Sequence, residues 1–281
     1  MVADFYCEAS GLAGQKWGAN SAEDSLPVVA LHGWLDNSDS FRLLAQQPGW
    51  DTFVALDLPG HGASPWKPAG ADYAIWNYTG ELSRHLSTYA APVHLIAHSM
   101  GGSAALCLAA AFPELVRSLV LIDSPGPIIT PENMMAKQLR QGVEASYEEK
   151  EPRRMAATED AVAVRKKATP RVGDAVLEAL VLRNIKPAGD GFVWRTDPRL
   201  KLASKLRLTE SQVAGLMGSV ECPVLAIRAI NGMIPTGLFE QRVAYLKQAK
   251  AVDLAGYHHL HTEDDVAGPL ASMIQEFQET L

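Results

Sequence analysis

The 281-residue sequence predicts an α/β protein in which a mostly parallel β-sheet is flanked by helices. Two observations support this fold class. Short apolar runs rich in β-branched residues alternate with stretches of helical periodicity, which is the pattern of β-α-β units. The apolar runs are also continuous, as expected of strands that are buried on both faces of a parallel sheet.

Six apolar runs are the predicted strands, and most of them end in a turn that carries glycine. They span residues 27–33, 52–62, 93–99, 117–127, 223–232 and 251–259. Helical patterns between them span residues 78–89, 101–112, 239–248 and 266–277. The opening stretch FYCEASGLAGQKWGA alternates more weakly and predicts an antiparallel hairpin at the sheet edge.

The regular alternation breaks between residues 124 and 221. This stretch is rich in charge, places Leu, Ala and Val at helical spacing, and carries turn signals at KPAGDG and TDPR. We therefore predict a core domain of residues 1–123 and 222–281, with a helical cap of residues 124–221 inserted between two strands. The run Arg165-Lys166-Lys167 in this cap has acidic neighbours and is interpreted as a solvated helix face.

Polar residues gather where the predicted strands end. In an open parallel sheet, ligands bind beyond the carboxyl ends of the strands. The unusual polar residues at these ends are His32, Asp57, His61, Ser99, Asp123 and His258. Their shared placement predicts a functional site at this edge of the sheet.

Ser99 stands at an abrupt strand-to-helix junction that reads AHSMGG. One interpretation is a nucleophile on a tight turn, which requires small neighbours such as Ala97 and Gly101. The N–H of Met100 at the helix start would then favour an oxyanion. The other interpretation is an N-cap of the helix. Two glycines at the helix start each cost about 1 kcal/mol relative to alanine, so they indicate a demand other than helix stability.

Four motifs, in order along the chain, resemble those of the α/β-hydrolase family. AHSMGG (97–102) resembles its nucleophile elbow, LHGWLDNSDSF (31–41) its HG oxyanion loop, DLPGHGAS (57–64) a second loop, and AGYHHLHTED (255–264) its catalytic-histidine loop. In the cap, GDGFVWRTDPRLKLASKLRLTESQV (189–213) resembles the serine hydrolase-like subgroup. Ala97 replaces the family's usual glycine but is small enough for the turn. The resemblance implies the α/β-hydrolase fold and a serine nucleophile, Ser99.

The family pattern also indicates which histidine is the base. In that pattern the catalytic histidine follows a glycine after the last strand, which favours His258 over His259, with His261 as the polar follower. A metal site on His259 and His261 is disfavoured, because the nearby sequence has no pattern of carboxylate or cysteine ligands. We expect no metal.

The acid departs from the commoner family layout. That layout places an Asp in the turn after the strand PVLAIRA, but here the turn INGMIPTG (230–237) contains no carboxylate. Asp253 would lie inside the last strand and Glu240 in a helix, so neither is well placed. Asp123 ends the strand after that of Ser99, and neighbouring strands lie about 4.8 Å apart, so its carboxylate can reach the histidine. Some family members use this position. The alternative is that Asp123 is a structural turn residue.

An oxyanion hole formed by the N–H groups of Trp34 and Met100 completes the expected site. Ser99 would attack an ester-like carbonyl while His258 takes its proton, and water would then release the acyl-enzyme. The other histidines near these loops are interpreted as structural: His32, His61 and His98. No organic cofactor is expected, since no G-x-G-x-x-G motif opens a helix.

A carboxylesterase is the leading function. The same residues also serve hydrolysis of C–C bonds, thioesters or lactones, and the choice among these would depend on the cap. A non-catalytic binding protein with the hydrolase fold is a further alternative, supported by the missing acid after residue 229.

Composition restricts the partners and the compartment. A net charge of −7 disfavours nucleic acid and anionic membranes as partners. The expected partner is a small-molecule ester-like substrate, as the resemblance to α/β-hydrolases implies. Three widely spaced cysteines fit a reducing, cytoplasmic location. The longest apolar stretch, residues 104–112, is too short to cross a bilayer. The oligomeric state stays open, a homodimer included.

Overall fold

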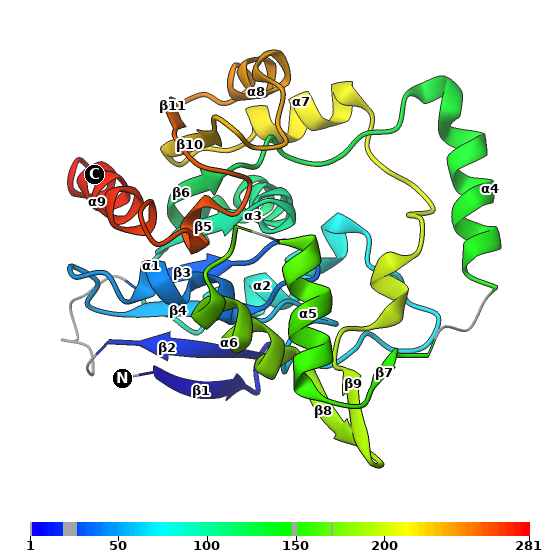
Figure 1. Ribbon diagram of the computed structural model, residues 1–281. Coiled ribbons are helices and arrows are strands. Elements are labelled where there is room, and N and C mark those ends of the chain that lie inside the picture. Colours follow the sequence, from blue (N-terminus) through cyan, green and yellow to red (C-terminus); the bar gives the residue numbers. More distant parts are fainter. Residues whose placement is uncertain (1, 19–26, 148–150, 170) are drawn as a thin grey trace.

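The computed structural model describes residues 2–18, 27–147, 151–169 and 171–281. Within these ranges, eight strands form one sheet in the order β1-β2-β4-β3-β5-β6-β10-β11 (Figure 1). Their bounds are β1 (Val2–Cys7), β2 (Leu12–Trp17), β3 (Val28–Leu31), β4 (Phe53–Leu56), β5 (Val93–His98), β6 (Val116–Ile122), β10 (Val224–Ala229) and β11 (Ala249–Leu254). β1 and β2 form the predicted antiparallel edge hairpin, and β2 pairs antiparallel with β4. The other neighbouring strands are parallel, which confirms the predicted fold class.

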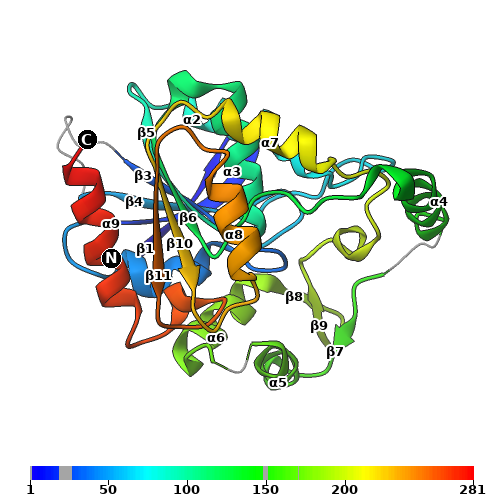
Figure 2. The same cartoon turned by 90° about the horizontal axis from the view of Figure 1, so that it is seen from above.

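Helices cover both faces of this sheet (Figure 2). On one face lie α2 (Thr79–Leu86), α3 (Met100–Ala111), α7 (Glu210–Gly218) and α8 (Thr236–Val243), and on the other α1 (Arg42–Ala45) and α9 (Ala267–Glu279). β5 illustrates the two-sided burial. Its Leu95 and Ala97 belong to the apolar cluster under α2 and α3, whereas Ile96 belongs to the cluster under α9. The continuous apolar runs of the sequence therefore fill two cores.

Residues 124–221, called the insertion below, separate β6 from β10. Besides α7 they form α4 (Met135–Ala145), β7 (Arg154–Met155), α5 (Thr158–Ala168), α6 (Asp174–Asn184), β8 (Ile185–Ala188) and β9 (Gly191–Trp194). In the described part of the insertion, the three strands form a small antiparallel sheet ordered β7-β9-β8. Helical periodicity did not indicate this sheet, because its strands have four residues or fewer and two of them flank the turn at Gly189.

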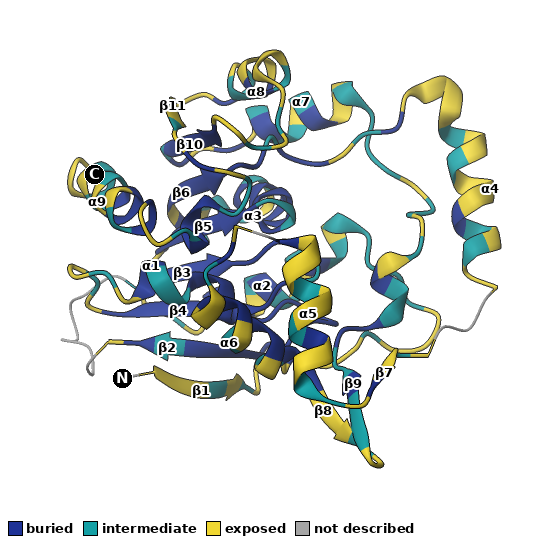
Figure 3. Cartoon of the chain, in the orientation of Figure 1, coloured by how far each residue is buried: buried dark blue, intermediate teal, exposed yellow. Residues whose placement is uncertain are grey.

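Parts of the insertion differ in how they meet the core. Val213 and Met217 of α7 are buried in the apolar cluster of α2 and α3. Leu177 and Leu180 of α6 form a smaller apolar cluster against Leu43 of the core. α4 instead stands apart and is largely exposed (Figure 3). No helix in the described ranges is long and apolar enough to cross a membrane.

The start of α3 lies directly against the end of β3. A Cβ atom on Gly101 would lie 2.3 Å from the carbonyl oxygen of Leu31 and 2.6 Å from that of His32. A Cβ atom on Gly102 would lie 2.3 Å from the Ser124 hydroxyl oxygen. These close approaches explain why glycines occupy helix positions where alanine would stabilise the helix more.

Replacing Gly101 with alanine tests this packing. Helix propensity alone would stabilise the variant by about 1 kcal/mol. The clash with two backbone oxygens outweighs that gain, because overpacking a tight core costs about 1–3 kcal/mol. We expect Gly101→Ala to lower the free energy of unfolding measured by chemical denaturation.

Gly215 provides the matched control. It is an exposed glycine within α7, and a Cβ atom there would meet no heavy atom within 4 Å. Gly215→Ala should therefore raise the free energy of unfolding by about 1 kcal/mol. If both substitutions stabilise the protein, the close packing of α3 on β3 is not the reason for Gly101.

Candidate active site

Backbone strain is concentrated at the carboxyl edge of the sheet. Among the described residues, the non-glycine residues with positive φ are Leu35 at 62°, Ser99 at 51° and Asp123 at 42°. Each such residue costs of order 1–3 kcal/mol and persists only where its surroundings enforce it. All three follow strands of the parallel sheet, after β3, β5 and β6. This clustering marks the edge as the candidate site.

Ser99 follows β5 on a tight turn, and its side chain does not cap α3. Its φ and ψ of 51° and −117° lie outside the usual N-cap region, and its hydroxyl makes no hydrogen bond to the helix N–H groups. The Ser99 Oγ lies instead 3.0 Å from Nε2 of His258. The turn is held by the Ser99 N–H, which donates to the Ile122 carbonyl, and by the Ser124 hydroxyl, which donates to the Ser99 carbonyl. The N-cap interpretation is therefore wrong.

Asp123 lies at the same level of the neighbouring strand. In the parallel register His98 pairs with Ile122, so Ser99 and Asp123 each follow one member of that pair. The buried carboxylate of Asp123 accepts from the Ala229 N–H at 3.0 Å through Oδ1, and Oδ2 lies 2.6 Å from Nδ1 of His258. Because a carboxylate accepts, Nδ1 carries the proton and the Nε2 lone pair faces the serine hydroxyl.

The turn after β10 makes room for this carboxylate. A Cβ atom on Gly232 would lie 2.6 Å from Oδ2 of Asp123. Asp253 lies in β11 as expected and is paired with Arg228. Glu240 lies within α8. Of the carboxylates considered from the sequence, Asp123 is the one that the structure brings to His258.

The two N–H groups expected to bind an oxyanion lie at the adjoining ends of β3 and α3. Met100 begins α3, where N–H groups have no partner within the helix. In the described part of the chain, neither the Met100 nor the Trp34 N–H donates to a loop carbonyl or a side chain. The Trp34 side chain is 52% exposed, and its indole N–H donates to the Leu200 carbonyl of the insertion at 3.0 Å.

Four imidazoles gather beside Ser99. The His98 ring packs at a tilt against those of His261, His258 and His259, with ring centroids 4.3, 4.7 and 5.0 Å away. Its Nε2 donates to the His258 carbonyl at 2.9 Å, so His98 holds the histidine loop as a structural residue. Burial and the neighbouring imidazoles hold the pKa of His98 well below its usual value. His98 is therefore neutral at neutral pH.

The same cluster bears on metal binding. His98, His258 and His259 offer ring nitrogens within 4.8 Å of one another. Both ring nitrogens of His258 already face Asp123 and Ser99, and Nε2 of His98 faces a carbonyl. A metal held by all three histidines would thus take His258 away from the serine. The sequence showed no pattern of carboxylate ligands near these histidines, but the structure places Oδ2 of Asp36 3.5 Å from Nε2 of His259.

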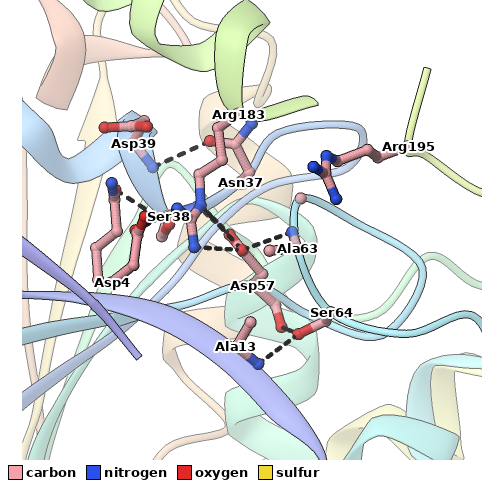
Figure 4. A network of polar contacts seen from close by, with 12 residues as sticks. Asp4, Ala13, Asn37, Ser38, Asp39, Asp57, Ala63, Ser64, Arg183 and Arg195 are labelled. Atoms are coloured by element: carbon pink, nitrogen blue, oxygen red, sulfur yellow. Dashed lines mark hydrogen bonds and ion pairs between the residues drawn. The ribbon is translucent and has the colours of Figure 1, made fainter. Parts of the chain in front are cut away.

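The other polar strand ends hold loops together. Nε2 of His32 accepts from the Leu58 N–H at 3.0 Å, and its Nδ1 donates to the Gly33 carbonyl. The buried Asp57 accepts from the Ser38 N–H at 2.8 Å and from Arg183 of α6 (Figure 4). These residues shape the surrounding loops and do not reach Ser99.

One contact of the insertion contradicts its sequence interpretation. Arg165 was expected on a solvated helix face, but its side chain is 15% exposed and its Nη2 pairs with Oδ1 of the buried Asp36. Lys166, the next residue, remains about half-exposed as expected. The partners lie 129 residues apart, so no local pattern could indicate the pair.

Comparisons with known proteins agree with the observed fold. The family profile described as the alpha/beta hydrolase fold matches residues 27–168. A serine hydrolase-like protein of Danio rerio is 31% identical over 282 residues, covering 95% of this chain and 84% of that protein. An esterase of Mycobacterium tuberculosis is 28% identical over 263 residues, covering 89% and 79%. The crystal structure of a hypothetical protein of Pseudomonas aeruginosa superposes with a TM-score of 0.88 at 31% identity, covering 99% of both chains.

Two buried histidines predict an acid-sensitive fold. Burial lowers the pKa of His61 and of His261 from 6.5 to about 3. Between these pH values the unfolded chain binds more protons than the folded chain. The free energy of unfolding should therefore fall as pH falls from about 6.5, by up to about 1.4 kcal/mol per pH unit for each histidine.

Chemical denaturation between pH 4.5 and 6.5 checks this effect, and His261→Met is the informative variant. Its side chain does not titrate, so its unfolding free energy should depend less steeply on pH than that of the wild type. Equal slopes in the two proteins would show that His261 is not held neutral by burial.

Proposed function

Because this chain belongs to the α/β-hydrolase family, in its serine hydrolase-like subgroup, we propose that it cleaves carboxylic esters through an acyl-enzyme on Ser99. The names of the serine hydrolase-like and esterase relatives support hydrolase chemistry. The observation that carries the proposal is the chain of contacts from Ser99 through His258 to Asp123, at 3.0 and 2.6 Å. This chain of contacts begins at Ser99, a residue of positive φ that directly precedes α3.

The first half of the proposed reaction forms the acyl-enzyme. Ser99 Oγ attacks the ester carbonyl carbon while Nε2 of His258 takes the hydroxyl proton. Asp123 keeps the other ring proton on Nδ1 and stabilises the imidazolium. The carbonyl electron pair moves onto oxygen, where the N–H groups of Met100 and Trp34 bind it. As the tetrahedral intermediate collapses, the alcohol leaves with the proton from His258.

The second half repeats these steps with water. His258 takes a proton from water, the resulting hydroxide attacks the acyl carbon, and the carboxylic acid leaves as Ser99 regains its proton. Every proton transfer uses His258, and the steps use no metal or organic cofactor. The contact of Asp123 with His258 also supports an enzyme over a non-catalytic protein, because the main argument for the latter was the absent acid after β10.

We propose that the partner is a small-molecule ester and that the protein acts in the cytoplasm. Two observations support this setting. The cysteines Cys7, Cys107 and Cys222 are all free, as in reducing compartments. The net charge of −7 disfavours nucleic acid and anionic lipid as partners.

A fluorophosphonate probe and a substrate panel test the reaction. We expect the probe to label the wild type, and Ser99→Ala to lose all labelling, because phosphonylation needs the serine hydroxyl. Ser103→Ala, one turn further along α3, should still be labelled. In the panel, short p-nitrophenyl esters should turn over faster than thioesters, lactones and dienoic ketones. An unlabelled wild type would contradict serine chemistry, and a preference for another substrate class would contradict the ester proposal.

Asp123→Asn tests the assigned acid. Asparagine can still accept from the Ala229 N–H, but its amide N–H₂ would face Nδ1 of His258 and disfavour the required tautomer. We expect kcat for p-nitrophenyl acetate to fall by about 10³–10⁴-fold with little change in thermal stability.

Asp253→Asn is the matched control for this variant. It removes a half-exposed carboxylate that pairs with Arg228 and does not contact His258. Its turnover should stay near that of the wild type. If Asp123→Asn behaves like this control, another group supports His258.

A further inference from the structure

The insertion directly binds two consecutive side chains of the loop that carries the Trp34 N–H, and it reaches the next residue through Asp57 of the core. Residues 33–38 are called the oxyanion loop here. Arg165 binds Asp36, the Asn37 amide donates to the Leu180 carbonyl at 2.8 Å, and the Ser38 N–H donates to Asp57, which Arg183 of α6 also binds (Figure 4). Insertion and oxyanion loop therefore form one polar network.

We propose that Arg165 is a positioning residue, which holds the oxyanion loop and the histidine loop in their reactive arrangement by binding Asp36. The inference rests on the proposed serine chemistry. It assigns α5 of the insertion a part in the reaction itself, in addition to any contact that the insertion makes with substrate.

Arg165 acts on the oxyanion loop at its strained residue. Its Nη1 donates to the Leu35 carbonyl at 3.4 Å, while its Nη2 binds Oδ1 of Asp36. Leu35 has a φ of 62° and directly follows Trp34. A positive φ at a leucine persists only where neighbours enforce it. The Arg165 guanidinium binds both the carbonyl of Leu35 and the side chain of the next residue, Asp36. The pair thus restrains the strained residue that directly follows Trp34, and through it the Trp34 N–H.

Asp36 transmits the contact to the histidine loop. Its Oδ2 lies 3.5 Å from Nε2 of His259, which neighbours His258 in the chain. In the same loop, the His258 carbonyl accepts from Nε2 of His98 at 2.9 Å. Asp36 is therefore a buried bridge between the insertion, the oxyanion loop and the histidine loop.

The electrostatics favour a permanent charge at this bridge. Burial alone would raise the pKa of Asp36, but Arg165 and then His259 outweigh it and hold the pKa well below its usual value. Asp36 is thus ionised at neutral pH. Without Arg165, a buried carboxylate would lose its main cationic partner, and the loop would have to move to hydrate it.

The test measures how fast a fluorophosphonate inactivates Arg165→Met, separating the maximal rate kinact from the half-saturation constant KI. The phosphoryl oxygen uses the same N–H donors as an ester oxyanion. Removing one such donor costs about 10²–10³-fold, so a displaced donor should lower kinact by at least about 10-fold. Because Arg165 is not expected to contact the probe, KI should change less than about threefold. Arg165→Lys should recover part of the loss.

Three further proteins complete the experiment, and one of them is the single variant Asp36→Asn. Lys166→Met removes the neighbouring positive charge of α5, whose partner is the exposed Asp174, and should react like the wild type. Asp36→Asn/Arg165→Met should react no more slowly than the slower single variant, because both changes break one contact. The double variant leaves no buried charge unpaired, so it replaces Arg165→Met in the comparison if that variant does not fold.

Three results would overturn the inference. The first is a kinact of Arg165→Met within twofold of the wild type, and the second is a raised KI of that variant at unchanged kinact. The third is a loss of kinact in the double variant that equals the combined losses of the two single variants. Labelling needs no ester turnover, so a wild type that is labelled but hydrolyses no ester refutes the ester proposal and still tests Arg165. A wild type that is not labelled refutes both.

Discussion

The hydrogen bond between the Asp123 carboxylate and Nδ1 of His258 is the contact on which the site depends. It sets the tautomer of His258, so that the Nε2 lone pair faces Ser99. It also joins the last loop of the core to the centre of the sheet, across 135 residues of chain. The contact requires Gly232, because any side chain there would occupy the space of the carboxylate. The turn after β10 contains no carboxylate of its own and leaves the room that the Asp123 carboxylate occupies.

Contacts from inside and outside the sheet hold the strained backbone around this hydrogen bond. Leu35, Ser99 and Asp123 adopt positive φ in the loops that follow three strands, and rigid surroundings must enforce each of them. Part of the enforcement comes from parallel pairing, since the Ser99 N–H binds the Ile122 carbonyl and the Asp123 N–H binds that of Ile227. The remainder comes from contacts that reach the loops from outside the sheet, such as Arg165 on the Leu35 carbonyl. The strained loops of this site are therefore held both by hydrogen bonds of the sheet and by side chains of the insertion.

Much of the fold could be predicted because it depends on local pattern. The continuous apolar runs predicted the parallel sheet, and the weaker alternation at the start predicted the β1–β2 hairpin. The short sheet of the insertion was missed, because strands of two to four residues have too few side chains to show a period. Arg165 was misjudged for a different reason. Its position in a charged run indicates solvent, and only its distant partner Asp36 explains its burial.

By itself, the sequence determined the fold class and the residues available for the site, since apolar periodicity and the motif around Ser99 are local properties of the chain. Tertiary structure decided which of these residues meet. It placed His258, which the sequence already favoured over His259, between Ser99 and Asp123, and it brought Asp36 between two loops and the insertion. The physical reason is that hydrogen bonds of about 3 Å depend on strand register and loop packing. These hydrogen bonds join residues more than 100 positions apart, so the sequence could propose Ser99, His258 and Asp123 as partners but could not give their contacts.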